Sequence, residues 1–142
     1  KGAYILHMLR YLVGYDVLIQ TLREYLYTPK PNNNQTTTKE FISLINENTN
    51  LDLQWFFDVY IYQNKLPVLN IIKTKEDMGT FLDLWWENKG FKMPIEISYN
   101  GINGKVNRKL FVNNQPTRIA LLSDEKYVLD PEGWLLFTKN FK

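Results

Sequence analysis

The sequence contains no cysteine and only one histidine in its 142 residues. Without cysteine the chain forms no disulfide and offers no thiolate, which excludes cysteine catalysis and Cys-based zinc sites. Hydrolytic zinc needs about three protein ligands and one open position. At helical spacing from His7 the neighbours are Ala3, Tyr4, Arg10 and Tyr11, and none of them is a carboxylate. We therefore expect no metal site here, and we interpret His7 as a structural residue.

Long apolar runs and a strong charge of either sign are also missing. No run approaches the roughly 20 residues of a membrane-spanning helix, and the net charge of +2 predicts no nucleic-acid partner. A Gly-rich phosphate loop is absent too, because Gly101 and Gly104 flank a hairpin turn and do not fit G-x-G-x-x-G. The lack of cysteine does not fix the compartment, so cytoplasmic and periplasmic or secreted locations are both compatible.

Hydrophobic residues make up 44% of the chain and aromatic residues 15%, which is enough for a substantial core. Residues 3–13 are apolar on nearly every helical face and are interrupted only by His7 and Arg10. A helix of this kind is expected to be buried. Gly14 predicts its end, and Asp16 is expected to cap a second helix.

Two more helices are predicted before the pattern changes. A polar loop with prolines and asparagines covers residues 28–38. Thr37 and Glu40 then have the spacing of a capping box at the start of a third helix. A fourth helix is predicted after Asp52.

After Leu66-Pro67 the hydrophobic period changes from helical to alternating, and turn signals separate short segments. The predicted strands are a hairpin about Asp77-Met78-Gly79, residues 95–99, Lys105–Val112, Thr117–Leu122, Lys126–Leu129 and Trp134–Phe137. Helices followed by strands predict an α+β chain with segregated units. We place a helical domain at residues 1–64 and a small antiparallel β-sandwich at residues 65–142.

Two ordered sets of residues resemble one family. The first set is Lys1-Gly2-Ala3, Leu6-His7-Met8-Leu9-Arg10, Gly14 and Leu22-Arg23-Glu24-Tyr25, and the second is Leu53-Gln54-Trp55-Phe56-Phe57-Asp58, Ile61-Tyr62 and Leu66-Pro67-Val68-Leu69. Together they resemble the downstream end of the gluzincin zinc aminopeptidases, the family of membrane alanyl aminopeptidase and leukotriene hydrolase. The resemblance covers about residues 1–69 by motif.

The resemblance implies that residues 1–64 are the helical tail of a thermolysin-like catalytic domain. The family binds zinc through H-E-x-x-H and a later Glu, and it also uses a catalytic Tyr. All of these residues would lie before Lys1, so the resemblance assigns no catalytic residue and no cofactor to this chain. Zinc would belong to the parent protein, and the partners would be the upstream catalytic domain and a peptide substrate. The start at Lys1-Gly2-Ala3, without a leader, also suggests a fragment. Alone, it is expected to self-associate or to expose an apolar patch.

The site candidates are few. Arg10, His7 and Arg23 are structural residues or part of a substrate wall, and Arg10 should be paired if it is buried.

The alternative interpretation is a stand-alone binding module, for a glycan or a protein, that uses Trp85, Trp86 and Tyr99. Three carboxylates lie nearby, Asp83, Glu87 and Glu96, and a pair of them would be needed for glycosidase chemistry. A plain strand, in which Leu82, Leu84 and Trp86 face the core, is the better interpretation. Lys105, Arg108 and Lys109 form a small basic spot that is solvated or meets an acidic domain.

Overall fold

The computed structural model describes residues 1–29, 36–121 and 126–142. Most of the predicted polar loop 28–38 therefore lies outside the described residues, as do Leu122 and the predicted turn at Ser123-Asp124. Within the described residues, no helix is both long and apolar enough to cross a membrane.

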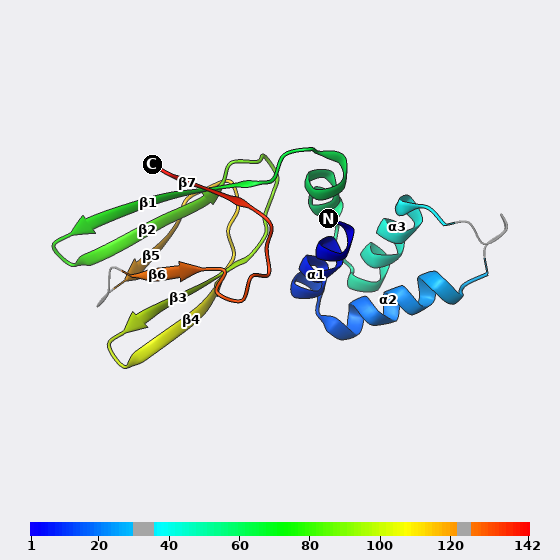
Figure 1. Ribbon diagram of the computed structural model, residues 1–142, viewed down its shortest axis with the longest axis horizontal. Helices are drawn as coiled ribbons and strands as arrows, with labels where there is room; N and C mark the ends of the chain where they lie inside the picture. Colours follow the sequence, from blue (N-terminus) through cyan, green and yellow to red (C-terminus); the bar gives the residue numbers. More distant parts are fainter. Residues whose placement is uncertain (30–35, 122–125) are drawn as a thin grey trace. The chain divides into compact units, whose positions relative to one another are not determined.

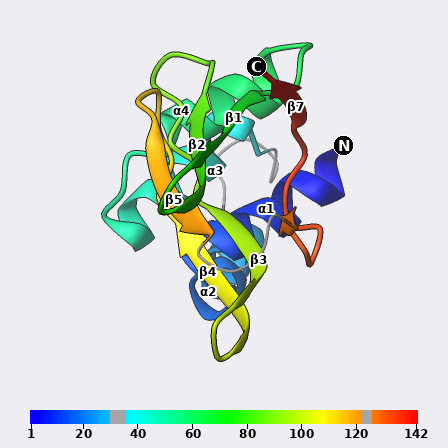
Figure 2. The same ribbon diagram turned by 90° about the vertical axis from the view of Figure 1, so that its left-hand side faces the viewer.

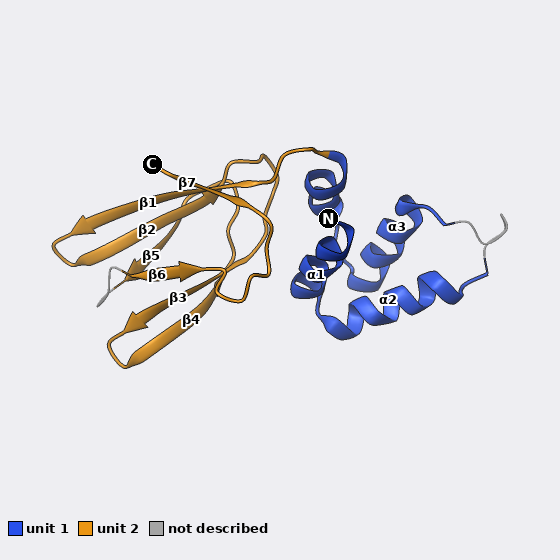
Figure 3. Cartoon of the chain, in the orientation of Figure 1, with its two compact units in different colours: residues 1–62 blue, residues 63–142 orange. Residues whose placement is uncertain are grey.

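The described residues form two compact units, Lys1–Tyr62 and Gln63–Lys142 (Figure 3). The first is helical and the second is built from strands, so the chain belongs to the mixed α+β class (Figure 1). The division lies two residues before the boundary that the change of hydrophobic period predicts.

The helical unit contains α1 (Gly2–Val13), α2 (Tyr15–Tyr27), α3 (Thr38–Thr49), α4 (Gln54–Phe57) and the π-helix η1 (Asp58–Tyr62). Gly14 ends α1 with a φ of 93°, a conformation that glycine adopts without a Cβ penalty. The prediction that Asp16 caps α2 is wrong. Gly14 occupies the cap position without a side-chain hydrogen bond, and Asp16 lies in the first turn, where its charge suits the helix dipole.

The predicted capping box at α3 is confirmed. The Thr37 hydroxyl accepts the Glu40 N–H at 3.3 Å, and the Glu40 carboxylate accepts the Thr37 N–H at 2.8 Å. Asn50 closes the helix in the left-handed conformation with a φ of 52°. Both ends of α3 therefore follow from local sequence.

Helix α1 is buried on one side only. Ile5, Met8 and Leu9 are buried, whereas Leu6 is 37% exposed and Val13 is half-buried. The rest of the helical core comes from α2, α3 and the segment from Leu53 to Tyr60; its buried apolar residues are Leu18, Ile42, Ile45, Leu53, Phe56, Phe57, Val59 and Tyr60. The all-round burial expected for residues 3–13 is thus not reached within the described residues.

The β unit contains two sheets. Their strands are β1 (Val68–Glu76), β2 (Gly79–Trp86), β3 (Ile95–Gly101), β4 (Gly104–Leu110), β5 (Thr117–Leu121), β6 (Tyr127–Leu129) and β7 (Thr138–Phe141). One sheet has the order β5-β2-β1-β7 and the other the order β4-β3-β6. The hairpins β1–β2 and β3–β4 lie in separate layers of this unit (Figures 1 and 2).

The sheets are not purely antiparallel, because β7 pairs in parallel with β1, from Val68 opposite Thr138 to Ile71 opposite Phe141. The buried side chain of Asn70 supports this pairing, because its Oδ1 accepts the Asn140 Nδ2–H at 2.8 Å.

The predicted strand Trp134–Phe137 is wrong. The Asp130 carboxylate instead accepts the N–H groups of Trp134 and Leu135, each at 2.8 Å, so the chain continues from the turn at Pro131-Glu132 without joining a sheet. The last strand begins at Thr138, directly after this segment.

The core of the β unit is centred on Trp86, which has no exposed surface. Its indole N–H donates to the Met93 carbonyl at 2.7 Å, and its ring meets Phe91 and Phe137 edge-on at centroid distances of 5.0 and 5.7 Å. The alternation along β2 is as predicted, since Leu82, Leu84 and Trp86 are all buried. Trp86 is therefore a core residue with a satisfied polar atom.

Candidate functional site

Two of the three predicted candidates meet on α1. The Arg10 Nη2 lies 3.1 Å from the His7 Nδ1, and the imidazole meets the Tyr4 ring edge-on at 5.4 Å. Because a guanidinium can only donate, His7 Nδ1 accepts and the ring proton lies on Nε2. Arg10 is half-buried and has the polar partner that its position requires.

His7 and Arg10 line a shallow hollow of about 260 Å³ between α1 and α2, together with apolar side chains that include Leu6 and Tyr15. Arg23 is exposed and belongs to a different hollow, beside Tyr15 and Asp16. The three candidates therefore do not form one site. Their arrangement supports packing and surface roles for His7 and Arg10.

The described residues around His7 do not fit a zinc ion. The only imidazole accepts a guanidinium N–H on one nitrogen, and no cysteine is available. Within residues 1–29, 36–121 and 126–142 no group of three or more histidine, aspartate or glutamate side chains is placed to hold a metal.

The aromatic platform that the sequence suggested is divided by the fold. Trp85 and Trp86 point to opposite faces of β2, and Tyr99 lies on β3 in the other sheet. Trp85 is half-buried, with the Lys142 ammonium 5.1 Å from its ring centroid. Trp86 is fully buried. A ligand therefore cannot stack on these three rings together.

The carboxylates near this strand do not form a catalytic pair. Asp83 lies 3.7 Å from Arg118, which also bonds Glu76 and covers the Phe81 ring. Glu87 is exposed at the end of β2, and Glu96 lies on β3 in the other sheet. Asp83 is thus neutralised by an exposed arginine, an arrangement typical of a structural surface pair.

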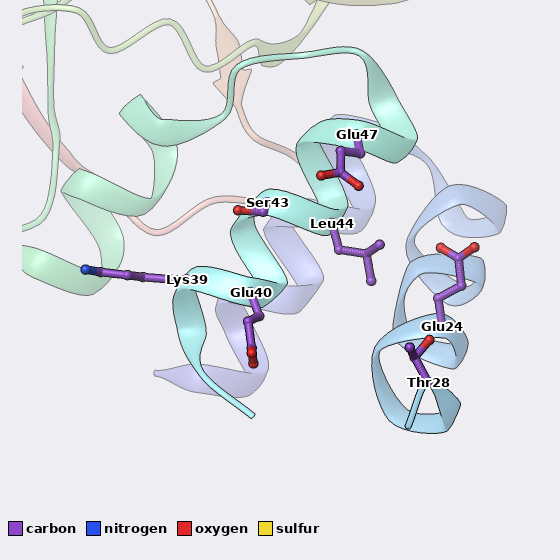
Figure 4. Close-up of a pocket in the computed structure, with 7 residues that line it drawn as sticks. All are labelled: Glu24, Thr28, Lys39, Glu40, Ser43, Leu44 and Glu47. Atoms are coloured by element: carbon purple, nitrogen blue, oxygen red, sulfur yellow. The ribbon is translucent and has the colours of Figure 1, made fainter. Parts of the chain in front are cut away.

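Another hollow, of about 330 Å³, lies between α2 and α3, where three carboxylates gather (Figure 4). Glu40 already accepts the Thr37 N–H in the capping box. Glu24 accepts the Asn48 amide at 2.7 Å. The third carboxylate is Glu47, on the same side of α3 as Glu40 (Figure 4). Two of the three acids therefore have structural partners within the helical unit.

A further hollow, of about 250 Å³, is lined by residues of β3, β4 and β6 in the smaller sheet. Its lining residues are Ser98, Tyr99, Asn100, Lys105, Lys126, Tyr127, Val128 and Pro131. Burial raises the pKa of the Tyr127 phenol above its ordinary value. Two lysines and two tyrosines here give a basic, aromatic surface next to β4. The basic spot that the sequence predicts at Lys105, Arg108 and Lys109 lies on this strand, at the edge of the sheet.

No family model matches the sequence, and no significant match among curated proteins was found.

Proposed function

We propose that this chain is the carboxy-terminal portion of a gluzincin-type zinc aminopeptidase and that it supports the catalytic domain without supplying catalytic residues. The parent protein would hydrolyse peptides from the amino end. The motif order described above supports this proposal. In the structure the first motif set occupies α1 and α2, and the second occupies α4, η1 and the start of β1.

The observation on which the proposal depends is the incomplete cover of α1. This helix is apolar almost all round, yet Leu6 is 37% exposed and the neighbouring Tyr15 is 59% exposed. Leaving a large apolar side chain in water forgoes roughly 1.5–3 kcal/mol. Leu6 and Tyr15 line the same hollow, and contiguous apolar surface marks contacts with other protein parts when it is large; the catalytic domain is the partner that the motifs imply.

The supporting role agrees with the residues present. His7 and Arg10 bind each other at the border of the apolar surface, where they would set the position of α1 against a neighbour. The metal and its general base would come from residues outside this sequence. Within the parent enzyme the chain would therefore act by packing.

The decisive experiment compares this chain with a longer product of the same gene. We expect the reading frame upstream of Lys1 to encode H-E-x-x-H some seventy or so residues earlier. The longer protein should hydrolyse an aminoacyl anilide and lose that activity to a chelator. The 142-residue chain should be inactive with or without added zinc. Zinc-dependent hydrolysis by the 142-residue chain, or an upstream frame without the motif, would reject the proposal.

The second candidate function is a stand-alone interaction module. The basic outer strand β4 favours a protein partner over a glycan, because the suggested aromatic platform is split between two sheets and two faces. A start codon at the boundary of this sequence would favour this candidate.

A further inference from the structure

Strand β4 lies at the edge of its sheet. The strand order is β4-β3-β6, and no described strand pairs with the outer side of β4. It spans 7 residues, whereas the other sheet edges, β5, β6 and β7, span 5, 3 and 4. A long edge strand offers backbone groups to any strand that can pair with it.

The register shows which backbone groups of β4 face outward. The Asp130 N–H donates to the Glu96 carbonyl at 2.7 Å, so Glu96 directs its backbone groups toward β6. Backbone direction alternates along a strand, and therefore Ile95, Ile97 and Tyr99 face β4. Their partners in the register are Leu110, Arg108 and Val106, respectively.

It follows that Lys105, Asn107 and Lys109 point their N–H and C=O groups away from β3. The turn gives an independent check, because Gly101 pairs with Gly104 across a two-residue connection. The residues that flank such a connection are bonded to each other, which places the next outward-facing residue at Lys105. Three consecutive outward-facing positions are enough to bond one short added strand.

The charge on this edge has one sign. Lys105, Arg108 and Lys109 are exposed, and β4 contains no acidic residue. Glu96, opposite Lys109 on β3, is the nearest carboxylate in the register. Lys105 and Lys109 are four residues apart and therefore share one face of the sheet. Lys126 and Lys105 also line the same hollow, which extends the basic surface.

This charge pattern discriminates between occupants. A second copy paired antiparallel about Asn107 would place Lys105 opposite Lys109 twice, and like charges in opposite positions are unfavourable. Lysines on edge strands commonly prevent such self-pairing. A strand with carboxylates at the same two positions reverses the sign of both contacts.

We propose that β4 binds an extended acidic segment of another polypeptide as an added antiparallel strand, with two carboxylates four residues apart opposite Lys105 and Lys109. The backbone groups at Lys105, Asn107 and Lys109 give affinity, and the two ammonium groups set the register. This proposal does not depend on whether the chain is part of a peptidase.

The probe is the fluorescein-labelled peptide Thr-Glu-Val-Thr-Val-Glu-Thr, blocked at both ends, titrated with the 142-residue chain. The matched peptide Thr-Glu-Val-Thr-Glu-Val-Thr has the same composition but places its carboxylates on opposite faces. We expect the first peptide to bind and the second to bind about tenfold more weakly. Amide resonances should shift at Lys105, Asn107 and Lys109.

The discriminating variant is Asn107→Pro. Proline removes an outward N–H and leaves the bonds to β3 intact, so the fold should be retained. We expect this variant to lose at least about 90% of the peptide affinity, and the matched variant Asn107→Ala to keep it within about twofold.

A charge-reversed pair makes the test independent of the proline variant. The double variant Lys105→Glu, Lys109→Glu should bind the peptide in which both glutamates are replaced by lysine. It should lose its affinity for the acidic peptide. The proposal is overturned by failure of the acidic peptide to bind, or by binding that survives Asn107→Pro in a folded protein. It is also overturned if the charge-reversed variant does not prefer the lysine peptide over the acidic one. A dimer in sedimentation that Asn107→Pro abolishes would overturn it as well.

Discussion

At the scale of single residues, Asp130 shows how one carboxylate can replace a strand with a turn. It has a φ of 54°, and it accepts the N–H groups of Trp134 and Leu135. Aspartate and asparagine tolerate the left-handed region better than other residues with a Cβ. The dipeptide Asp130-Pro131 is a turn signal in the sequence, but the two side-chain bonds depend on the position of residues further along.

Asp130→Ala should destabilise the β unit by about 2–4 kcal/mol, because it removes two charge-assisted hydrogen bonds and leaves alanine at a positive φ. Asp130→Asn keeps the backbone conformation and one acceptor, so it should cost less than half as much. Urea unfolding followed by tryptophan fluorescence measures both. Equal losses for the two variants would show that neither the charge nor the backbone angle matters.

Tyr127 makes stability depend on alkaline pH. Burial raises the pKa of its phenol from 10.0, because the folded state disfavours the phenolate. The neutral phenol makes its full contribution to the free energy of unfolding below the pKa that it has in the unfolded chain. This contribution is lost as the pH rises through the pKa of the folded state. The free energy of unfolding should therefore fall more steeply above about pH 10 in the wild type than in Tyr127→Phe. Parallel curves for the two proteins would contradict this.

Candidate residues were harder to predict than core residues. The period of two along β2 correctly assigned Leu82, Leu84 and Trp86 to the core. The contact between His7 and Arg10 follows from their helical spacing, whereas the sequence predicted only that a buried Arg10 would be paired and did not identify its partner. Burial of Asn70 and its bond to Asn140 could not be inferred, because these residues are far apart in the sequence.

At the scale of elements, α3 is the clearest case of local control. The side chains of Thr37 and Glu40 accept each other's backbone N–H groups, as the capping-box spacing of the two residues predicted. The Tyr25 hydroxyl also donates to the Thr37 carbonyl at 3.0 Å, a contact that substitution of the Thr37 side chain leaves in place.

Thr37→Ala should lower the stability of the helical unit by about 1 kcal/mol, because the N–H of Glu40 loses its acceptor. Thr37→Ser keeps the hydroxyl and should unfold within about 0.3 kcal/mol of the wild type. Thermal unfolding followed by far-UV circular dichroism makes the comparison. A serine variant as unstable as the alanine variant would indicate that packing of the threonine methyl group dominates.

Elements with local signals were predictable, and elements defined by distant partners were not. The helix-ending Gly14 and the alternation along β2 are visible in the sequence. The π-helix η1 reads as ordinary helix, because the apolar spacing from Trp55 to Tyr60 does not distinguish the two. Strand β7 is polar and short, and only its pairing with β1 makes it a strand.

At the scale of the whole molecule, the α+β class followed from the change of period after Pro67. Pairing order within the sheets could not be derived, because many orders satisfy the same alternation of buried and exposed residues. The thermolysin-like origin of the helical unit remains a prediction based on motif order.

Apolar surface on the helical unit gives a measurable property of the isolated chain. Leu6, Tyr15 and Leu26 are 37%, 59% and 71% exposed. We expect the chain to bind an apolar fluorescent dye or to self-associate, and Leu6→Gln with Tyr15→Gln should reduce either effect. Ile102→Gln, in the β3–β4 turn, is the matched control and should change it less. A monomer that binds no dye would argue against a missing partner.

The parallel pairing of β1 with β7 leaves a vulnerable interval during synthesis on the ribosome. The β1–β2 and β3–β4 hairpins can close as soon as their own residues emerge, whereas Asn70 must wait for a partner 70 residues later. Until then the outer side of β1 is an open edge on which the Asn70 amide oxygen lacks its partner Asn140, and closing so distant a contact is slow. A nascent chain stalled before Thr138 would expose that edge to neighbouring chains, which makes ribosome pausing near this point a hazard for aggregation.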